Sequence, residues 1–364
     1  MSVSEIISLS IRKLLLDCCY ILCRYKCLLL ISIPTGVTYS NLIYISHQIN
    51  QFAAVIISLF SCQNEKNNLL PRSTGAINEI IFVVNNDLWS TNVKDTIYNI
   101  FAKQVEGLSW TEPSFDIVQI PLSSYTKIFQ THRNIIFLEK SDTNKLYFLK
   151  NKNSKDQLIA IFLFKNPKDL LNNFIINGPK VFNAFKKIEL NRLLSKSIKT
   201  RNLDRVFSKH KILFSIIEPF TPVLDTTNFS WLEFSPKNKE LIKGIVIFEI
   251  PSTKPFNDSI FVNKSDSIFK KYVLGEHKNT YMEIEKNYPL HVSPLQRKHL
   301  YGHSIKGLWK IKNGFMGGPF ISNALVDSLN NRTIFLYGFI FNPGKAKRND
   351  IQEFEATFKS LKFR

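Results

Sequence analysis

The sequence has little cysteine. Only five of its 364 residues are cysteines, and the last of them is Cys62. A disulfide-stapled fold, a cysteine-ligated zinc site and a thiol nucleophile are therefore excluded from everything after that position. Acidic residues are also scarce, with 29 Asp+Glu against 48 Lys+Arg, so the chain carries a formal net charge of +19.

This basic excess alone would suit nucleic acid or an anionic membrane. Most of the basic residues are lysines, however, and they are spread along the chain. Asn, Ile and Phe are abundant as well, a combination that A/T-rich codons produce together. Nucleic-acid readers gather Arg and aromatic residues at defined positions. We therefore expect no nucleic-acid partner, and a basic nucleic-acid-binding protein remains the second alternative function.

The familiar motifs of enzyme chemistry are missing too. The sequence contains no Gly-x-Ser-x-Gly elbow, no His-Glu-x-x-His and no Gly-x-Gly-x-x-Gly. Three histidines lie close together in the sequence: His291, His299 and His303. No Asp or Glu stands between Glu285 and Asp327 to complete a ligand shell. We predict surface histidines, no metal, no cofactor and no catalytic residue set.

Two apolar runs lie near the N-terminus, at 27–33 and 52–60. The second of them, 52–60, is followed by Ser61, Cys62 and the polar stretch QNEKNN. A short apolar segment, a small residue and a cysteine resemble a bacterial lipobox, in which the thiol receives a lipid. The pattern predicts a signal peptide or membrane segment over 1–62, lipidation of Cys62, and a tether over 63–76.

An uncleaved anchor is the alternative for this segment. In that interpretation residues 27–61 stay in the membrane, with Arg24 and Lys26 on the cytoplasmic side. The body of the protein is exported in both interpretations, so both predict a location in the cell envelope.

Beyond the tether, apolar runs of strand length alternate with helical patterns. We predict an α+β fold of two α/β-sandwich-like units, 77–210 and 211–364, each a mostly antiparallel sheet with helices packed on it. A helical pattern from 167 to about 199 is interrupted at Gly178-Pro179, and the region 276–305 lacks a pattern. The expected strands are 80–84, 115–121, 134–139, 146–150, 158–164, 229–234, 244–251, 307–311 and 332–341, with one more at the start of 211–223.

The expected helices include 91–103, 258–274 and a closing helix from 350. Asp350 and Glu353 have the Asp-x-x-Glu spacing of a capping box. We therefore expect these two side chains to cap the N-terminus of the closing helix.

Several strings together resemble a known family. They are TGAINEIIFVVNNDLW (74–89), EPSFDIVQIP (112–121), THRNIIFLE (131–139), FSWLEF (229–234), GLWKIKNGFMGGPF (307–320) and FLYGFIFNPGKAKRND (335–350). This set resembles the domain of unknown function 4837, a family of putative lipoproteins from Bacteroidota, over about 70 to 364. The resemblance implies a cell-envelope location, an N-terminal lipid anchor and no assigned activity.

The first candidate site is His132-Arg133-Asn134, at the start of an expected strand. Arg133 could clamp a carboxylate or phosphate, with His132 beside it as a proton donor. The alternative is structural, with Arg133 paired to an acid such as Asp116 or Glu139.

The second candidate site is Met316-Gly317-Gly318-Pro319-Phe320. Paired glycines permit positive φ, so we expect a turn there. Its N–H groups could form an anion nest, or the turn could let the chain double back beside Trp309. Trp309, Gly317, Gly318 and Phe320 are therefore candidate ligand- or partner-binding residues.

These features favour a lipid-anchored envelope protein, a non-enzymatic binding or assembly module facing the periplasm or cell surface. Its expected partners are the membrane and an unknown envelope component. A hydrolase-like envelope enzyme using His132 and Arg133 is the first alternative.

Overall fold

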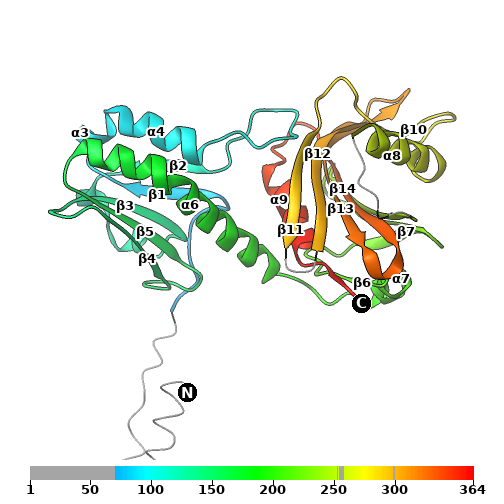
Figure 1. Cartoon of the computed structure of the whole chain (residues 1–364), viewed down its shortest axis with the longest axis horizontal. Helices are drawn as coiled ribbons and strands as arrows, with labels where there is room; N and C mark the ends of the chain where they lie inside the picture. The colour runs from blue at the N-terminus through cyan, green and yellow to red at the C-terminus, as the bar shows by residue number, and fades with distance from the viewer. Residues whose placement is uncertain (1–69, 252, 254–257, 298–299) are drawn as a thin grey trace, which may run out of the picture. The chain divides into compact units, whose positions relative to one another are not determined.

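The computed structural model describes residues 70–251, 253, 258–297 and 300–364 (Figure 1). The predicted signal segment and Cys62 lie outside the described residues. Leu70–Arg364 form one compact unit, which contains two large sheets. In this part of the chain, no helix is both long enough and apolar enough to cross a membrane. The predicted α+β class is confirmed.

The first sheet has the strand order β2-β1-β3-β5-β4. Its strands are β1 (Glu79–Val83), β2 (Asp116–Ile120), β3 (Asn134–Lys140), β4 (Lys145–Lys150) and β5 (Leu158–Phe164). All neighbours in it are parallel except β4 and β5. The prediction of a mostly antiparallel sheet is wrong here. Helices between successive strands return the chain to the same end of the sheet, which makes those strands parallel.

Helices cover both faces of this sheet. Helices α4 (Asn92–Phe101) and α6 (Pro167–Leu194) pack on one face, and Tyr125 and Phe129, from the segment with η1 (Leu122–Ser124) and α5 (Lys127–Gln130), pack on the other. Short α3 (Asn86–Trp89) precedes α4.

The long helix α6 does not break at Gly178-Pro179, contrary to the prediction. A Cβ on Gly178 would lie 2.7 Å from Ile100 Cδ1 of α4. The glycine therefore allows the two helices to approach closely, and tertiary packing keeps α6 continuous despite the proline.

The second sheet is antiparallel, as predicted, and has the order β10-β12-β13-β14-β9-β8-β7, with β11 also paired to β12. It curls into a half-barrel (Figure 1). Its strands are β7 (Thr221–Thr226), β8 (Phe229–Phe234), β9 (Ile242–Ile250), β10 (Tyr281–Ile284), β11 (His291–Arg297), β12 (Leu300–Lys312), β13 (Gly317–Asp327) and β14 (Arg332–Phe341). Strands β10 and β11 correct the prediction that 276–305 is irregular. Most of β11 is exposed, so its sequence lacks an apolar face.

This second sheet carries an apolar core on each face. Helix α8 (Asp258–Tyr272) packs on one face, while α7 (Asp204–Lys209) and α9 (Arg348–Lys359) pack on the other. On the α9 face, the Phe354 ring occupies the space that a Cβ on Gly338 would fill, 2.7 Å away. Smaller elements complete the chain: η2 (Arg201–Leu203), β6 (Ile212–Leu213), η3 (Ser328–Asn330) and β15 (Lys362–Phe363), with β6 and β15 paired.

The N-terminus of α9 is capped by a distant carboxylate. Glu112 accepts hydrogen bonds from the N–H groups of Lys347 (2.8 Å) and Arg348 (2.9 Å). The predicted capping box is therefore wrong. Asp350 and Glu353 instead form ion pairs with Lys243 of β9. A local sequence rule cannot find Glu112, because it lies 235 residues before Lys347.

Glu355 joins α9 to two other elements. It pairs with Lys306 of β12 at 2.6 Å and with Lys186 of α6 at 3.7 Å. Burial alone would raise the pKa of Glu355, but the two lysines outweigh it and hold that pKa at about 2. The ionised carboxylate is therefore stabilised in the folded state.

We predict that Glu355→Gln lowers the free energy of unfolding by about 2 kcal/mol at pH 7. Because the folded pKa is depressed, this stability is present above the unfolded pKa of about 4.3 and disappears as the pH falls toward 2. Urea unfolding from pH 7 to pH 2.5 measures it. The exposed Glu240 provides the control Glu240→Gln. Equal pH profiles for the two variants would contradict the prediction.

Candidate functional site

His132, the first residue predicted to bind a ligand, is buried, with 5% exposure. Its Nδ1 donates to the Asn134 carbonyl (2.9 Å), and its Nε2 lies 2.8 Å from Glu79 Oε1. Gly75 lies against the ring, because a Cβ there would be 2.0 Å from Nε2. Both ring nitrogens are therefore engaged within the protein.

Arg133 and Asn134 both contact one buried carboxylate. Glu189 of α6 has a side chain that is 1% exposed. Its Oε2 accepts from Arg133 Nη1 (3.1 Å), and its Oε1 accepts from Asn134 Nδ2 (2.7 Å). Arg133 thus pairs with an acid, as the structural alternative expected, but the acid is neither Asp116 nor Glu139. Asp116 pairs with Arg348 at 2.7 Å instead.

Arg192 completes this group. Its Nη1 donates to Glu189 Oε1 (2.5 Å) and to Asn134 Oδ1 (2.9 Å), and its Nη2 donates to the Arg133 carbonyl (2.8 Å). Burial lowers the pKa of Arg192, against the opposing effect of Glu189. We call Glu79, His132, Arg133, Asn134, Glu189 and Arg192 the Glu189 cluster. Its hydrogen bonds and ion pairs join β3 and the residues before it to α6. The binding role predicted for His132–Asn134 stays a prediction.

We predict that Arg133→Ala destabilises the protein by about 3 kcal/mol, because it leaves Glu189 with one guanidinium fewer in a buried site. Arg205 is the matched control, since its side chain is 91% exposed and its ion pair with Asp225 spans 3.9 Å. Arg205→Ala should change stability by less than about 0.5 kcal/mol. Chemical denaturation of both variants makes the comparison, and similar small losses would contradict a structural role for Arg133.

The second predicted site is not a turn at Gly317 and Gly318. Both glycines lie in β13, and neither has a positive φ. The expected nest of positive-φ glycines is therefore absent from this segment. A Cβ on Gly317 would lie 2.8 Å from the Trp309 carbonyl oxygen, and one on Gly318 would lie 2.0 Å from that of Ile340. Close approach of neighbouring strands is the reason for glycine at both positions.

Trp309 and Phe320 are interior residues, 3% and 0% exposed. The Trp309 indole N–H donates to the Ile340 carbonyl (3.2 Å). Phe320 is the register partner of Phe339, so Ile340 comes next to Pro319, which has no N–H to donate. The indole N–H of Trp309 thus gives the Ile340 carbonyl a hydrogen bond that β13 cannot provide at Pro319.

Trp309 also lines a cavity of about 170 Å³, on the face of the sheet that α8 covers. Aromatic and thioether side chains make up much of its wall: Trp231, Trp309, Phe315, Phe339, Met282 and Met316. The segment 273–280, between α8 and β10, closes one side. We call this space the indole cavity. Phe315 is 86% exposed, so an aromatic ring accessible to solvent marks its edge.

The wall of the indole cavity also has polar groups, which include the exposed Glu276 and His277 as well as Trp231 and Glu233. Trp231 and Glu233 are two residues apart on β8 and both line it. Burial raises the pKa of Glu233, and no ion pair with this carboxylate occurs in the described residues. Trp231 Nε1 is buried, likewise without a hydrogen-bond partner in that part of the chain. Sequence reasoning missed both residues. The signal was the spacing in FSWLEF, which places them on one strand face.

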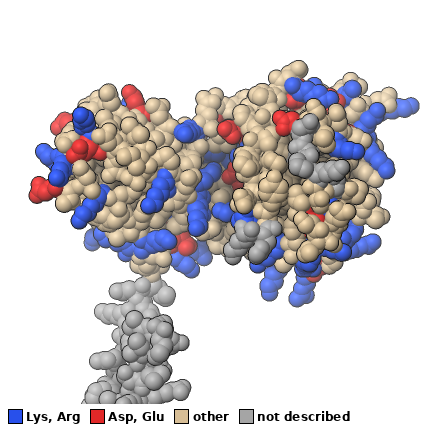
Figure 2. All heavy atoms as spheres, in the orientation of Figure 1, with Lys and Arg blue, Asp and Glu red and all other residues tan. Residues whose placement is uncertain are grey.

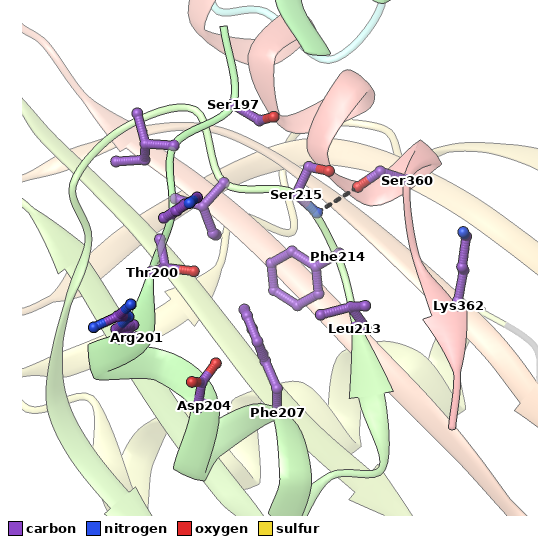
Figure 3. Close-up of a pocket in the computed structure, with 13 residues that line it drawn as sticks. Ser197, Thr200, Arg201, Asp204, Phe207, Leu213, Phe214, Ser215, Ser360 and Lys362 are labelled. Atoms are coloured by element: carbon purple, nitrogen blue, oxygen red, sulfur yellow. Dashed lines mark hydrogen bonds between the residues drawn. The ribbon is translucent and has the colours of Figure 1, made fainter. Parts of the chain in front are cut away.

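A second hollow, of about 390 Å³, lies near the start of α7 (Figure 3). The rings of Phe207 and Phe214 lie within it, and the Ser215 N–H donates to Ser360 Oγ at 2.7 Å. Arg201, Asp204 and Lys362 are exposed. Because its charged groups are already solvated, this hollow is a weaker candidate than the indole cavity.

The predicted surface histidines do not form a metal site with other described residues. His291 lies in β11 and His303 in β12, while His299 is outside the described residues. No group of three potential His, Cys, Asp or Glu ligands occurs within 70–364 where the structure is described.

Comparison with known families separates the chain into two parts. Residues 199–360 match the model of a domain of unknown function (DUF4837). These residues form a DUF4837 domain. Residues 73–197 match a different model, a domain of unknown function (DUF8532). The expectation that the first family extends from about 70 to 364 is therefore corrected. No curated protein matches the chain.

The two candidate sites fall in different parts. The Glu189 cluster is made entirely from residues of the DUF8532 stretch, whereas the indole cavity is made entirely from the DUF4837 domain. The cavity thus lies in the stretch matched by DUF4837, and Trp309, which lines it, belongs to the string GLWKIKNGFMGGPF of that stretch.

Proposed function

We propose that this protein is a non-enzymatic binding module of the cell envelope, and that the indole cavity of its DUF4837 domain is the ligand site. The supporting observation is a cavity with aromatic and thioether walls that contains one half-buried carboxylate. Ligand sites in proteins are typically apolar hollows with a few polar groups that fix orientation.

The walls define the ligand class. A cavity of about 170 Å³ accepts a ring-sized apolar group. Glu233 is the acceptor for a donor group on that ligand. The nearest cation along the paired strand, Lys243, is already bound to Glu218, Asp350 and Glu353. An apolar amine fits best, because its ammonium pairs with Glu233 and contacts the faces of Trp231 and Trp309.

We predict that benzylamine binds more tightly than benzyl alcohol, a neutral analogue of similar size. Glu233→Gln should reduce benzylamine affinity about tenfold, the effect of losing one partly buried charge pair, and leave benzyl alcohol within about twofold. Calorimetric titration of the full chain measures both. Glu240→Gln, which removes an exposed carboxylate, is the control. If neither probe binds, or if Glu233→Gln and Glu240→Gln behave alike, this ligand class is wrong.

The envelope location rests on the N-terminal sequence. An apolar run, a small residue and Cys62 before a polar stretch support a lipid anchor. Two or more acyl chains hold a protein firmly on a bilayer. An uncleaved anchor over 27–61 is the alternative.

We predict that the membrane-extracted protein begins at Cys62 and that its intact mass includes a diacylglyceryl group on that residue. The Cys62→Ser variant should lack this added mass. An unmodified Cys62 in the extracted wild-type protein would rule out lipidation, and retention of residues 27–61 would favour the uncleaved anchor.

The two alternative functions have less support. His132 and Arg133 are the residues of the hydrolase alternative, but their side chains contact the carboxylates of Glu79 and Glu189 inside the Glu189 cluster. Lys and Arg side chains are dispersed over the face drawn in Figure 2, with acidic groups between them. That distribution does not favour a dedicated nucleic-acid track.

A further inference from the structure

A second opening, separate from the indole cavity, lies among β11, β12 and α9. It is a groove of about 370 Å³, and Leu190 of α6 also lines it. Three cationic side chains line it: Arg297, Lys306 and Lys359. We call it the basic groove.

Two of these cations have no ion-paired acid among the residues that the structure describes. Lys306 is balanced by Glu355 at 2.6 Å. Arg297 and Lys359 are half-buried, and within the described part of the chain neither forms an ion pair. Arg297 donates to the Lys359 carbonyl, which fixes the guanidinium close to the lysine backbone. The groove therefore keeps two unpaired positive charges near each other.

The charges in the groove are mutually unfavourable. Burial lowers the pKa of Lys359, and repulsion from Arg297 and Lys187 lowers it further, against a smaller opposing effect of Glu355. Burial also lowers the pKa of Arg297. An anion between Arg297 and Lys359 would offset their mutual repulsion, because each positive charge would then have a negative partner.

Polar groups beside the cations indicate an oxygen-rich anion. Ser293 and Ser304 lie on adjacent strands and both line the groove. Guanidinium, ammonium and hydroxyl donors together suit phosphate, which offers several acceptor oxygens and up to two negative charges.

We propose that the basic groove binds a phosphate group, with Arg297 and Lys359 as its principal ligands. The group is supplied either by a soluble phosphate compound or by an anionic lipid headgroup. This site is independent of the indole cavity and of the proposed amine ligand.

The test titrates the full chain with inorganic phosphate and with dihexanoyl phosphatidic acid, and dihexanoylglycerol serves as the lipid without phosphate. We expect Arg297→Gln and Lys359→Gln each to weaken binding about tenfold or more, since each removes a charged hydrogen bond. Lys239→Gln removes an exposed lysine and should leave affinity unchanged. Glu355→Gln should strengthen binding, because it removes the acid in the groove.

The outcomes separate the two sources. Binding of both phosphate compounds, lost in Arg297→Gln and Lys359→Gln, assigns a general phosphate site. Binding of phosphatidic acid alone, with the same losses, assigns a headgroup site. If neither compound binds, or if Lys239→Gln weakens binding as much as Lys359→Gln, the proposal is wrong. Circular dichroism melting without ligand checks that each variant is folded.

Discussion

Burying the carboxylate of Glu189 constrains how the first sheet and α6 assemble. An ionised carboxylate in a protein interior is several kcal/mol unfavourable unless charged and hydrogen-bonding partners surround it. Glu189 obtains them from Arg133, Asn134 and Arg192. Asn134 also donates to the backbone carbonyl of Glu79, so β1 is tied to the same group. Displacing α6 by one turn would separate Glu189 from Arg133 and Asn134 and leave it only Arg192 of the same helix, and this makes the observed register strongly preferred.

Much of the secondary structure was predictable from the sequence, because its signals are local. The apolar run at 80–84 and the helical spacing in 91–103 correspond to β1 and α4. Strand direction was not predictable in the same way, since it depends on which strands become neighbours. The prediction of the α9 cap from local sequence is wrong for a related reason. Asp350 and Glu353 have the spacing of a capping box, but Lys243 attracts both, and only the folded chain brings Glu112 to the helix N-terminus.

The candidate sites show the same limit. Motif reasoning selected Gly317 and Gly318 for positive φ, whereas close strand packing explains them. It selected Trp309 but could not show the cavity beside it, because the wall includes residues between α8 and β10 and strands far apart in sequence. The total charge of +19 does not by itself indicate a binding partner. Its local distribution is informative: among the described residues, Arg192 and Lys243 pair with acids, whereas Arg297 and Lys359 form no ion pair there.

The cap of α9 joins residues from the two ends of the described chain, because Glu112 accepts from the N–H groups of Lys347 and Arg348. A ribosome releases the DUF8532 stretch before the DUF4837 domain, and α9 is among the last segments to emerge. Domains generally fold as they are synthesised, the N-terminal one first. The carboxylate that receives the helix can therefore already be in place when α9 forms. Nascent chains that stop before residue 347 would leave Glu112 without those two N–H donors and the curled sheet without one of its covering helices.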